Sequence, residues 1–287
     1  MSRLAYLNGR FVRQAEAGVS IEDRGFQLGD GVYEVWAVMD GRLADAEGHF
    51  ARLRRSLGEL AIAMPMSRAA LTVALRETVR RNRVKHGIVY LQVTRGVAHR
   101  DHAFPAAPTT PTVVITARVV DPLAAEAKAA VGVAVITLPE NRWGRCDIKT
   151  VNLLPNVLAK QAARQEGAFE AWFVDQDGLV TEGASSNAWI VDADGVLRTR
   201  DIGANILRGV TRLTLLDVAR DAGYRVEERP FTVEEAKGAR EAFLTGAGAL
   251  VMPIVRIDGA PVANGHPGEV ASLLRAAYIS RAAQTAI

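Results

Sequence analysis

Two short stretches near the start of the chain alternate apolar and polar residues on both sides of a tight-turn dipeptide. LAYLNGRFV contains Asn8-Gly9, and VYEVWAVMDGRL contains Asp40-Gly41. Asn-Gly and Asp-Gly favour the two-residue turns whose twist matches paired antiparallel strands, and a period of two places alternate side chains on one face. The pattern therefore predicts two antiparallel hairpins rather than a regular β-α-β series.

Longer segments follow these hairpins in mixed order. Apolar periodicity predicts helices over residues 46–61 and 67–83, and strands in GIVYLQVTRG and PTVVITARVV. After DPLAAEAKAA the strand pattern restarts with GVAVITLP. Further strands are expected around AWFVDQDG, SSNAWIVDADGVLRT, YRVEERP and EAFLTG, with helices near 152–166, 208–222 and 267–284.

This order and the chain length predict two mixed α/β (α+β) domains. We expect a smaller N-terminal domain over residues 1–121, a linker over 122–127 and a larger C-terminal domain over 128–287. Of the 287 residues, 49% are hydrophobic, which is enough for a sizeable core. No low-complexity segment interrupts the pattern.

Several classes of protein are disfavoured by the composition. MSRLAYLNGR does not resemble a signal peptide, and no apolar run approaches the ~20 residues needed to span a bilayer. The single cysteine, Cys146, cannot form an intrachain disulfide, which fits a reducing compartment. Arginines and carboxylates alternate as on solvated helix faces, and no nucleic-acid or zinc pattern is present. We expect a soluble, cytoplasmic protein with no metal, membrane or nucleic-acid partner.

Lysine is rare in this chain, since only five of the 35 Lys and Arg residues are lysines. Four of these lysines lie in segments typical of solvated surface, whereas Lys149 lies in RCDIKTVNLL, where Asp147, Lys149 and Val151 share one face of a period-two pattern. A lysine there is either ion-paired or desolvated. Burial lowers the pKa of a lysine, and a neutral amine can form an imine with a carbonyl cofactor.

Three other stretches would let a ligand approach the backbone. TEGASSN places Glu182 beside small and hydroxyl residues, although an ordinary polar turn has the same composition. ILRGVTR places Gly209, Val210 and Thr211 at the first turn of a helix, where free N–H groups suit phosphate, although most helix N-termini bind nothing. LTGAGAL, residues 244–250, suits a second backbone cradle or simple close packing.

Taken together, these motifs resemble one family over nearly the whole chain. EDRGFQLGDGVYEV, HFARL, YLQVTRG, RCDIKTVNLLPNVLAKQ, TEGASSN and ILRGVTR occur in the order found in D-amino-acid aminotransferases, which are pyridoxal 5'-phosphate (PLP) enzymes of fold type IV. The resemblance implies PLP between the two domains, an internal aldimine on Lys149, and Glu182 on the pyridine nitrogen. It also implies a phosphate site made of Arg52 and the backbone at Leu207, Val210 and Thr211, with Gly246 and Ala247 nearby.

The same resemblance implies a substrate site and a reaction. Arg100 and His102 of VTRGVAHRDHAFP match a pair that traps the substrate carboxylate together with a tyrosine, here Tyr33. In the family this loop crosses a homodimer interface, so each active site would borrow Arg100 and His102 from its partner. The expected reaction is ping-pong transfer of an amino group from a D-amino acid such as D-alanine or D-glutamate to a 2-oxo acid such as 2-oxoglutarate. The other four histidines are expected at the surface or in packing.

One stretch departs from the family pattern. Where D-amino-acid aminotransferases carry serine and threonine hydroxyls, this chain has Gly246, Ala247 and Gly248. Losing a hydroxyl bond to the phosphate would cost about 1.5–3 kcal/mol unless backbone N–H groups replace it. Small residues here also occur in transaminases of (R)-amines or branched-chain L-amino acids, and 4-amino-4-deoxychorismate lyases share the scaffold, so these activities and an arginine-rich binding protein are the alternatives.

Overall fold

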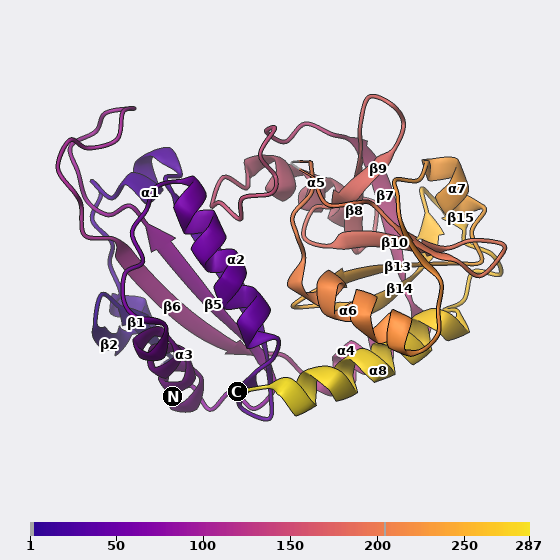
Figure 1. Cartoon of the computed structure of the whole chain (residues 1–287), viewed down its shortest axis with the longest axis horizontal. Coiled ribbons are helices and arrows are strands. Elements are labelled where there is room, and N and C mark those ends of the chain that lie inside the picture. The colour runs from indigo at the N-terminus through magenta and orange to yellow at the C-terminus, as the bar shows by residue number, and fades with distance from the viewer. Residues whose placement is uncertain (1–2, 204) are drawn as a thin grey trace. The chain divides into compact units, whose positions relative to one another are not determined.

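The computed structural model describes residues 3–203 and 205–287, which form two compact units (Figure 1). The first unit contains the residues up to Asp121 together with two returning segments, Ile148–Asn152 and Thr285–Ile287. The second contains Pro122–Asp147 and Leu153–Gln284. The predicted linker over 122–127 is wrong, because these residues begin a helix, α4 (Pro122–Val131), of the second unit. The predicted domain over 128–287 is also interrupted, since Lys149 and its neighbours belong to the first unit.

A six-stranded sheet forms the first unit, in the order β2-β1-β6-β5-β3-β4. Both predicted hairpins are confirmed, because Leu7 pairs with Arg10 across Asn8-Gly9 and Met39 pairs with Arg42 across Asp40-Gly41. The strands are β1 (Leu4–Leu7), β2 (Arg10–Arg13), β3 (Gly31–Met39), β4 (Arg42–Leu43), β5 (Gly87–Thr94) and β6 (Thr112–Val119). The helical segments are η1 (Gln14–Glu16), α1 (Arg24–Leu28), α2 (Ala46–Glu59) and α3 (Arg68–Arg81).

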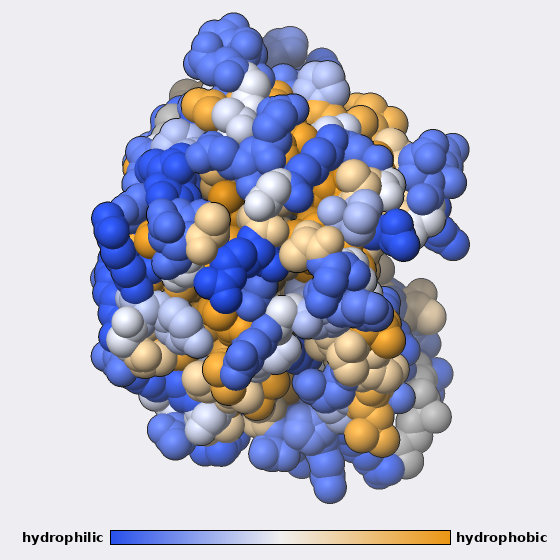
Figure 2. Space-filling model, turned by 90° about the vertical axis from the view of Figure 1, so that its right-hand side faces the viewer, coloured by the Kyte–Doolittle hydropathy of each residue, from blue (hydrophilic) through white to orange (hydrophobic). Residues whose placement is uncertain are grey.

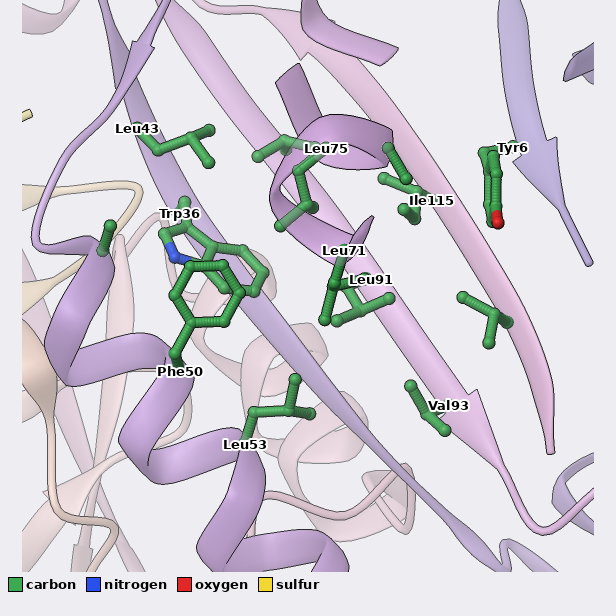
Figure 3. Packing of buried hydrophobic residues seen from close by; sticks show 14 of the residues in the cluster. Tyr6, Trp36, Leu43, Phe50, Leu53, Leu71, Leu75, Leu91, Val93 and Ile115 are labelled. Carbon is green, nitrogen blue, oxygen red and sulfur yellow. The ribbon is translucent and has the colours of Figure 1, made fainter. Parts of the chain in front are cut away.

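Helices α2 and α3 cover one face of this sheet and close its core (Figures 1 and 3). Figure 3 shows Trp36 of β3 against Phe50 of α2, with Leu71 and Leu75 of α3 over the neighbouring strands. The two helices match the predicted ranges to within a turn, because their apolar residues recur at helical spacing. One face of the sheet therefore packs into this core, and the side chains of the opposite face point away from it.

The second unit is built on a nine-stranded mixed sheet in the order β12-β11-β10-β13-β14-β7-β8-β9, with β15 paired to β14. Its strands are β7 (Val133–Pro139), β8 (Glu170–Val174), β9 (Val180–Gly183), β10 (Asn187–Val191), β11 (Leu197–Thr199), β12 (Val226–Glu228), β13 (Glu241–Gly246), β14 (Leu250–Ile257) and β15 (Ala260–Pro261). Besides α4, its helices are α5 (Leu154–Gln165), α6 (Val210–Asp221), α7 (Val233–Lys237) and α8 (Glu269–Thr285).

Strand β14 lies inside this sheet although the sequence did not predict it. Pro253 lacks the N–H that a central strand needs, so its presence argues against a strand. In the structure Pro253 pairs with Phe243 of β13, and pairing with β7 on the other side begins only at Ile254. The proline is therefore tolerated because it precedes the part of β14 that has neighbours on both sides.

Figure 2 shows a face on which hydrophilic residues predominate and apolar ones lie scattered between them. Among the residues that the structure describes, no helix combines the length and apolar character needed to cross a bilayer.

Candidate active site

Lys149 lies on a short segment that pairs with the free edge of β3. The Tyr33 N–H donates to the Lys149 carbonyl at 3.0 Å, and the Val151 N–H donates to the Gly31 carbonyl at 3.1 Å. Because β4 pairs with β3 only at Val38 and Met39, the other end of this edge is open to the returning chain. The period-two pattern around Lys149 therefore does not form a full strand, but the main-chain pairing fixes the lysine beside Tyr33.

The Lys149 side chain lies over an aromatic ring. Its Nζ is 4.2 Å from the centre of the Tyr33 ring, which stacks on Tyr90 with 5.6 Å between centres. Burial, with Tyr33 adding to it, raises the pKa of Tyr90 to about 12. Within residues 3–203 and 205–287, no carboxylate lies within ion-pair distance of Lys149, so the structure gives no support to a structural ion pair at this position.

A buried ionic cluster occupies the opposite side of β3. Glu34 is 0% exposed and accepts hydrogen bonds from Nε and a terminal nitrogen of Arg52, at 2.7 and 2.8 Å. The Nδ1 of His49 lies 2.8 Å from the same carboxylate and must carry a proton there, because a carboxylate only accepts. Burial alone would raise the pKa of Glu34, but Arg52 and His49 lower it to about 2. Burial lowers the pKa of His49 against the opposing effect of Glu34, so its ring is neutral at physiological pH.

The sequence carries a signal for this cluster in the alternation of β3. Val32, Glu34, Trp36 and Val38 alternate along β3, and all four are buried against the helical layer. A carboxylate in such a row needs a cation and hydrogen-bond donors from the facing helix. The prediction that His49 lies at the surface or only packs is corrected, since it is buried and hydrogen-bonded to Glu34.

Glu182 of β9 is buried and oriented by an arginine that the sequence analysis did not identify. Arg142 follows β7, donates to Glu182 at 2.6 Å, and also donates twice to Glu140 at 2.8 and 2.6 Å. Burial would lower the pKa of Arg142, but the two carboxylates raise it, so this cation stays charged at all working pH values. Burial likewise raises the pKa of Glu140, and Arg142 brings it below its usual range. A fixed cation therefore borders Glu182.

The second oxygen of Glu182 accepts from Asn187, whose side-chain N–H2 also donates to the Leu207 carbonyl, at 2.9 and 3.0 Å. The Leu207 N–H donates back to Glu182 at 3.0 Å. The prediction that the Leu207 backbone binds phosphate does not fit this geometry, because that N–H already serves Glu182. A Cβ at Gly209 would overlap the Asn187 Oδ1, so only glycine allows the chain to pass here into helix α6.

Helix α6 begins directly after this glycine. Val210 and Thr211 are its first two residues, both are buried, and Gly209 at the N-cap has no side chain to satisfy their N–H groups. The first N–H groups of a helix have no partner within it, and with the helix dipole they favour an anion. The structure therefore keeps Val210 and Thr211 as anion-binding candidates close in sequence to the Glu182 contacts.

Residues 246–249 form the turn between β13 and β14, where the Ala249 N–H donates to the Gly246 carbonyl at 3.1 Å. A Cβ at Gly246 would lie 3.2 Å from the Ser185 carbonyl oxygen, so this turn lies beside the TEGASSN segment. Ser185 and Ser186 in turn donate to the buried carboxylate of Glu170, at 2.7 and 3.1 Å. Two of the small-residue motifs are thus neighbours in the second unit.

Arg100 and His102 lie on an exposed loop between β5 and β6. Within the described residues of the single chain, no hydrogen bond joins Tyr33 to either of them. The structure thus places Tyr33 beside Lys149 but does not by itself assemble the predicted carboxylate trap.

Comparison with known proteins gives a consistent result. Residues 31–257 match the family Amino-transferase class IV. A D-alanine aminotransferase of Bacillus licheniformis is 40% identical over 282 residues, covering 97% of this chain and 98% of that protein. One from Staphylococcus epidermidis is 39% identical over 273 residues, covering 95% of each.

Solved structures agree on the architecture. A branched-chain amino acid aminotransferase from Escherichia coli superposes with a TM-score of 0.90 at 24% identity, covering 98% of this chain and 95% of that one, which is a likeness of fold. A T.th. branched-chain amino acid aminotransferase with pyridoxamine 5'-phosphate gives a TM-score of 0.88 at 28% identity, covering 98% and 94%. The predicted fold-type IV architecture is confirmed, and the chain belongs to the class IV aminotransferases.

Proposed function

We propose that this protein is a PLP-dependent aminotransferase that transfers an amino group between a D-amino acid, of the D-alanine or D-glutamate type, and a 2-oxo acid such as 2-oxoglutarate. The observation that carries the proposal is the amine of Lys149, which lies over Tyr33 with no carboxylate partner among the described residues. The 40% identity to a D-alanine aminotransferase supports the choice of substrate.

The residues present fit PLP, which offers an aldehyde, a pyridine nitrogen and a phosphate. We assign the amine to Lys149, the carboxylate facing the nitrogen to Glu182, and the phosphate to the N–H groups of Val210 and Thr211. Arg52, which the sequence also predicts at the phosphate, gives two of its nitrogens to Glu34 and would contribute through its positive charge. The turn at Gly246 and Ala247 would add backbone contacts, and Leu207 would act by holding Glu182 in place.

When bound, the cofactor supplies an electrophilic carbon and a conjugated ring that accepts the electron pair left when the substrate Cα loses its proton. Glu182 holds a proton at the pyridine nitrogen, and its orientation is fixed by Arg142, Asn187 and the Leu207 N–H. Lys149 Nζ would take the proton from the substrate Cα, because its side chain is tethered beside the reacting centre. Tyr33 limits the positions that Nζ can reach.

Substrate orientation is assigned to Arg100, His102 and Tyr33, which would bind the α-carboxylate. We further propose a homodimer in which this loop serves the partner's site. Large apolar side chains remain exposed around the loop in the single chain, namely Ile21, Phe26, Val97 and Phe104, and a second copy would cover them. Mixing Arg100→Ala and Lys149→Ala proteins tests the sharing, because each heterodimer keeps one intact site; verified heterodimers that stay inactive would contradict it.

Two alternatives have weaker support. The branched-chain enzymes share the fold, but the identity to them is 24–28%, against 40% for the D-alanine enzyme. A 4-amino-4-deoxychorismate lyase would release its product without consuming an amino acceptor. The cytoplasmic location expected from the sequence remains a prediction.

One experiment separates these activities. The PLP-loaded protein is mixed with D-alanine while the visible absorbance band of the bound cofactor is followed, and 2-oxoglutarate is then added. A D-amino-acid aminotransferase loses this band and regains it on adding the 2-oxo acid, and L-leucine or an (R)-amine has little effect. A lyase shows no such dependence on the acceptor, and a binding protein shows no change.

The variants for this experiment are Lys149→Ala and Lys149→Arg, with Lys85→Ala as the matched control. Borohydride reduction followed by mass spectrometry should place the cofactor on Lys149 in the unaltered protein and in the control. Neither Lys149 variant should retain a reducible adduct. An adduct at another lysine with near-normal turnover would refute the assignment.

A further inference from the structure

The loop that carries Arg100 and His102 has a closed base. The Arg24 N–H donates to the Gly96 carbonyl at 2.9 Å, and the Ala98 N–H donates to the Glu22 carbonyl at 3.3 Å. Gly96 has φ +98°, and a Cβ there would overlap the Thr110 carbonyl oxygen, so the two ends of the loop touch where only glycine fits. Beyond this base the loop is exposed, so other contacts must hold its conformation.

That support comes from the side chain of Arg24. It is 2% exposed, and one terminal nitrogen donates to the Asp101 carbonyl at 2.6 Å. Asp101 is the residue between Arg100 and His102, so this single bond holds the main chain that carries both side chains. The Arg24 Nε donates to Asp30 at 2.8 Å, which fixes the guanidinium plane and offsets its buried charge.

Asp30 joins Arg24 to a second buried arginine. Arg95, at the start of the loop, donates to both oxygens of Asp30 at 2.7 and 3.0 Å. Its remaining donors reach the carbonyls of Leu60 and Ala61 just after α2, at 2.6 and 3.2 Å. A cation suits this end of a helix because its last carbonyls are unsatisfied.

Arg95 also contacts the far part of the loop. Its guanidinium carbon lies 3.7 Å from the centre of the Phe104 ring, and its main-chain carbonyl accepts from the Thr109 hydroxyl at 2.6 Å. The loop is therefore attached at Gly96, Asp101, Phe104 and Thr109, on both sides of the two predicted substrate residues.

We propose that Arg24, Asp30 and Arg95, here called the loop anchor, position Arg100 and His102 for the substrate carboxylate. The inference rests on the proposed function, because it concerns residues assigned to that site. The anchor residues do not touch substrate; they lower the ordering cost of an exposed loop, and a preorganised loop binds a carboxylate more tightly than a mobile one. Specificity for carboxylate-bearing substrates therefore depends on a buried cluster behind the loop.

The test uses Arg24→Lys in the PLP-loaded protein. Lysine keeps the positive charge beside Asp30 but cannot reach the Asp30 carboxylate and the Asp101 carbonyl with a planar fork. We expect kcat/KM for D-alanine to fall about 10- to 100-fold, mainly through KM. The single-turnover rate with D-alaninol, which lacks the carboxylate, should change less than about twofold. Arg80→Gln, at an exposed pair on α3, is the matched control and should behave like the unaltered enzyme.

Hydrogen exchange gives a readout independent of activity. In Arg24→Lys the amides of residues 98–104 should exchange at least about tenfold faster, with β5 and α2 unchanged. Thr109→Val removes only the hydroxyl bond to the Arg95 carbonyl, so it should change kcat/KM for D-alanine and the hydrogen exchange of the loop in the same direction but by less. This milder variant replaces Arg24→Lys in the test if Arg24→Lys does not fold.

Each remaining outcome decides a different claim. Unchanged hydrogen exchange at residues 98–104 would overturn the proposed role of the loop anchor. An equal loss of rate with D-alanine and with D-alaninol would also overturn it, because that pattern indicates a general structural defect. If Arg100→Ala lowers D-alanine turnover but the anchor variants do not, the carboxylate assignment stands and the anchor fails. If Arg100→Ala itself leaves D-alanine kinetics unchanged, the proposed substrate site is wrong whatever the loop does.

Discussion

Replacing Glu34 with glutamine removes a buried charge while keeping the volume of the side chain. Glu34 is fully buried and accepts charged hydrogen bonds from Arg52 and a further bond from His49. Glutamine lacks the negative charge that offsets Arg52. Its side-chain N–H2 would also face Arg52 and His49, which are themselves donors. Breaking a buried ion pair from one side costs about 3–5 kcal/mol, and we expect about 3 kcal/mol because the amide oxygen still accepts one bond.

The pKa of Glu34 gives a similar magnitude independently. Burial alone would raise this pKa, but Arg52 and His49 lower it from 4.5 to about 2. At 1.36 kcal/mol per pKa unit, the folded state favours the ionised carboxylate by about 3 kcal/mol. Because the folded pKa lies below the unfolded one, this stabilisation is present above about pH 4.5 and is lost as the pH falls towards 2.

Urea unfolding followed by tryptophan fluorescence measures the effect, since Trp36 is packed near this cluster. The difference between the unaltered protein and Glu34→Gln should be constant from pH 8 to pH 5 and shrink at lower pH. Glu16→Gln, at the exposed ion pair with Arg13, is the control and should show no measurable change. A loss below about 1 kcal/mol for Glu34→Gln, or a difference that does not depend on pH in acid, would refute this account of the cluster.

Three further predictions concern the second unit. Glu182→Gln should still bind PLP but lower the single-turnover rate with D-alanine by at least about tenfold, because an amide stabilises a protonated pyridine less than a carboxylate does; unchanged rates would remove Glu182 from this role. Gly209→Ala should lower the midpoint of thermal unfolding and weaken PLP binding measured by fluorescence titration, since its Cβ would overlap the Asn187 Oδ1. Burial raises the pKa of the Cys146 thiol to about 11, so its alkylation by iodoacetamide should be slow at pH 7.5 and rise about tenfold per pH unit up to pH 10, and a fast reaction at neutral pH would contradict this.

Local sequence patterns predicted much of the fold, because turn residues and apolar periodicity act between residues that are close along the chain. The turns at Asn8-Gly9 and Asp40-Gly41 need no distant partner, and the helices over Ala46–Glu59 and Arg68–Arg81 follow from their apolar periodicity. The return of Ile148–Asn152 to the first unit could not be predicted in this way. It depends on an open edge of β3, which is known only once the pairing of β4 is known.

In the candidate site, too, some residues are predictable from local sequence and others depend on distant parts of the chain. Lys149, Glu182 and Tyr33 are visible in the sequence because their motifs are local. Asn187 is the last residue of the TEGASSN motif, but Arg142, which also orients Glu182, is 40 residues away from it along the chain, and nothing in its own surroundings marks it. Partners of this kind become evident only when strands and loops from separate parts of the chain converge.

The scarcity of lysine has a physical explanation in the buried groups. Among the described residues, no lysine is buried. Five arginines are buried, namely Arg24, Arg52, Arg95, Arg212 and Arg275. A guanidinium stays charged and bridges two acceptors in a fixed plane, so it can hold a carboxylate such as Asp30 or Glu34 against separate elements of the fold. An amine loses its proton far more readily when it is desolvated, which weakens a structural ion pair but is necessary for attack on a carbonyl carbon. Arginine fills these buried structural positions, whereas Lys149 is half-buried over the Tyr33 ring with no carboxylate partner among the described residues, which fits the role in amine chemistry that we propose for it.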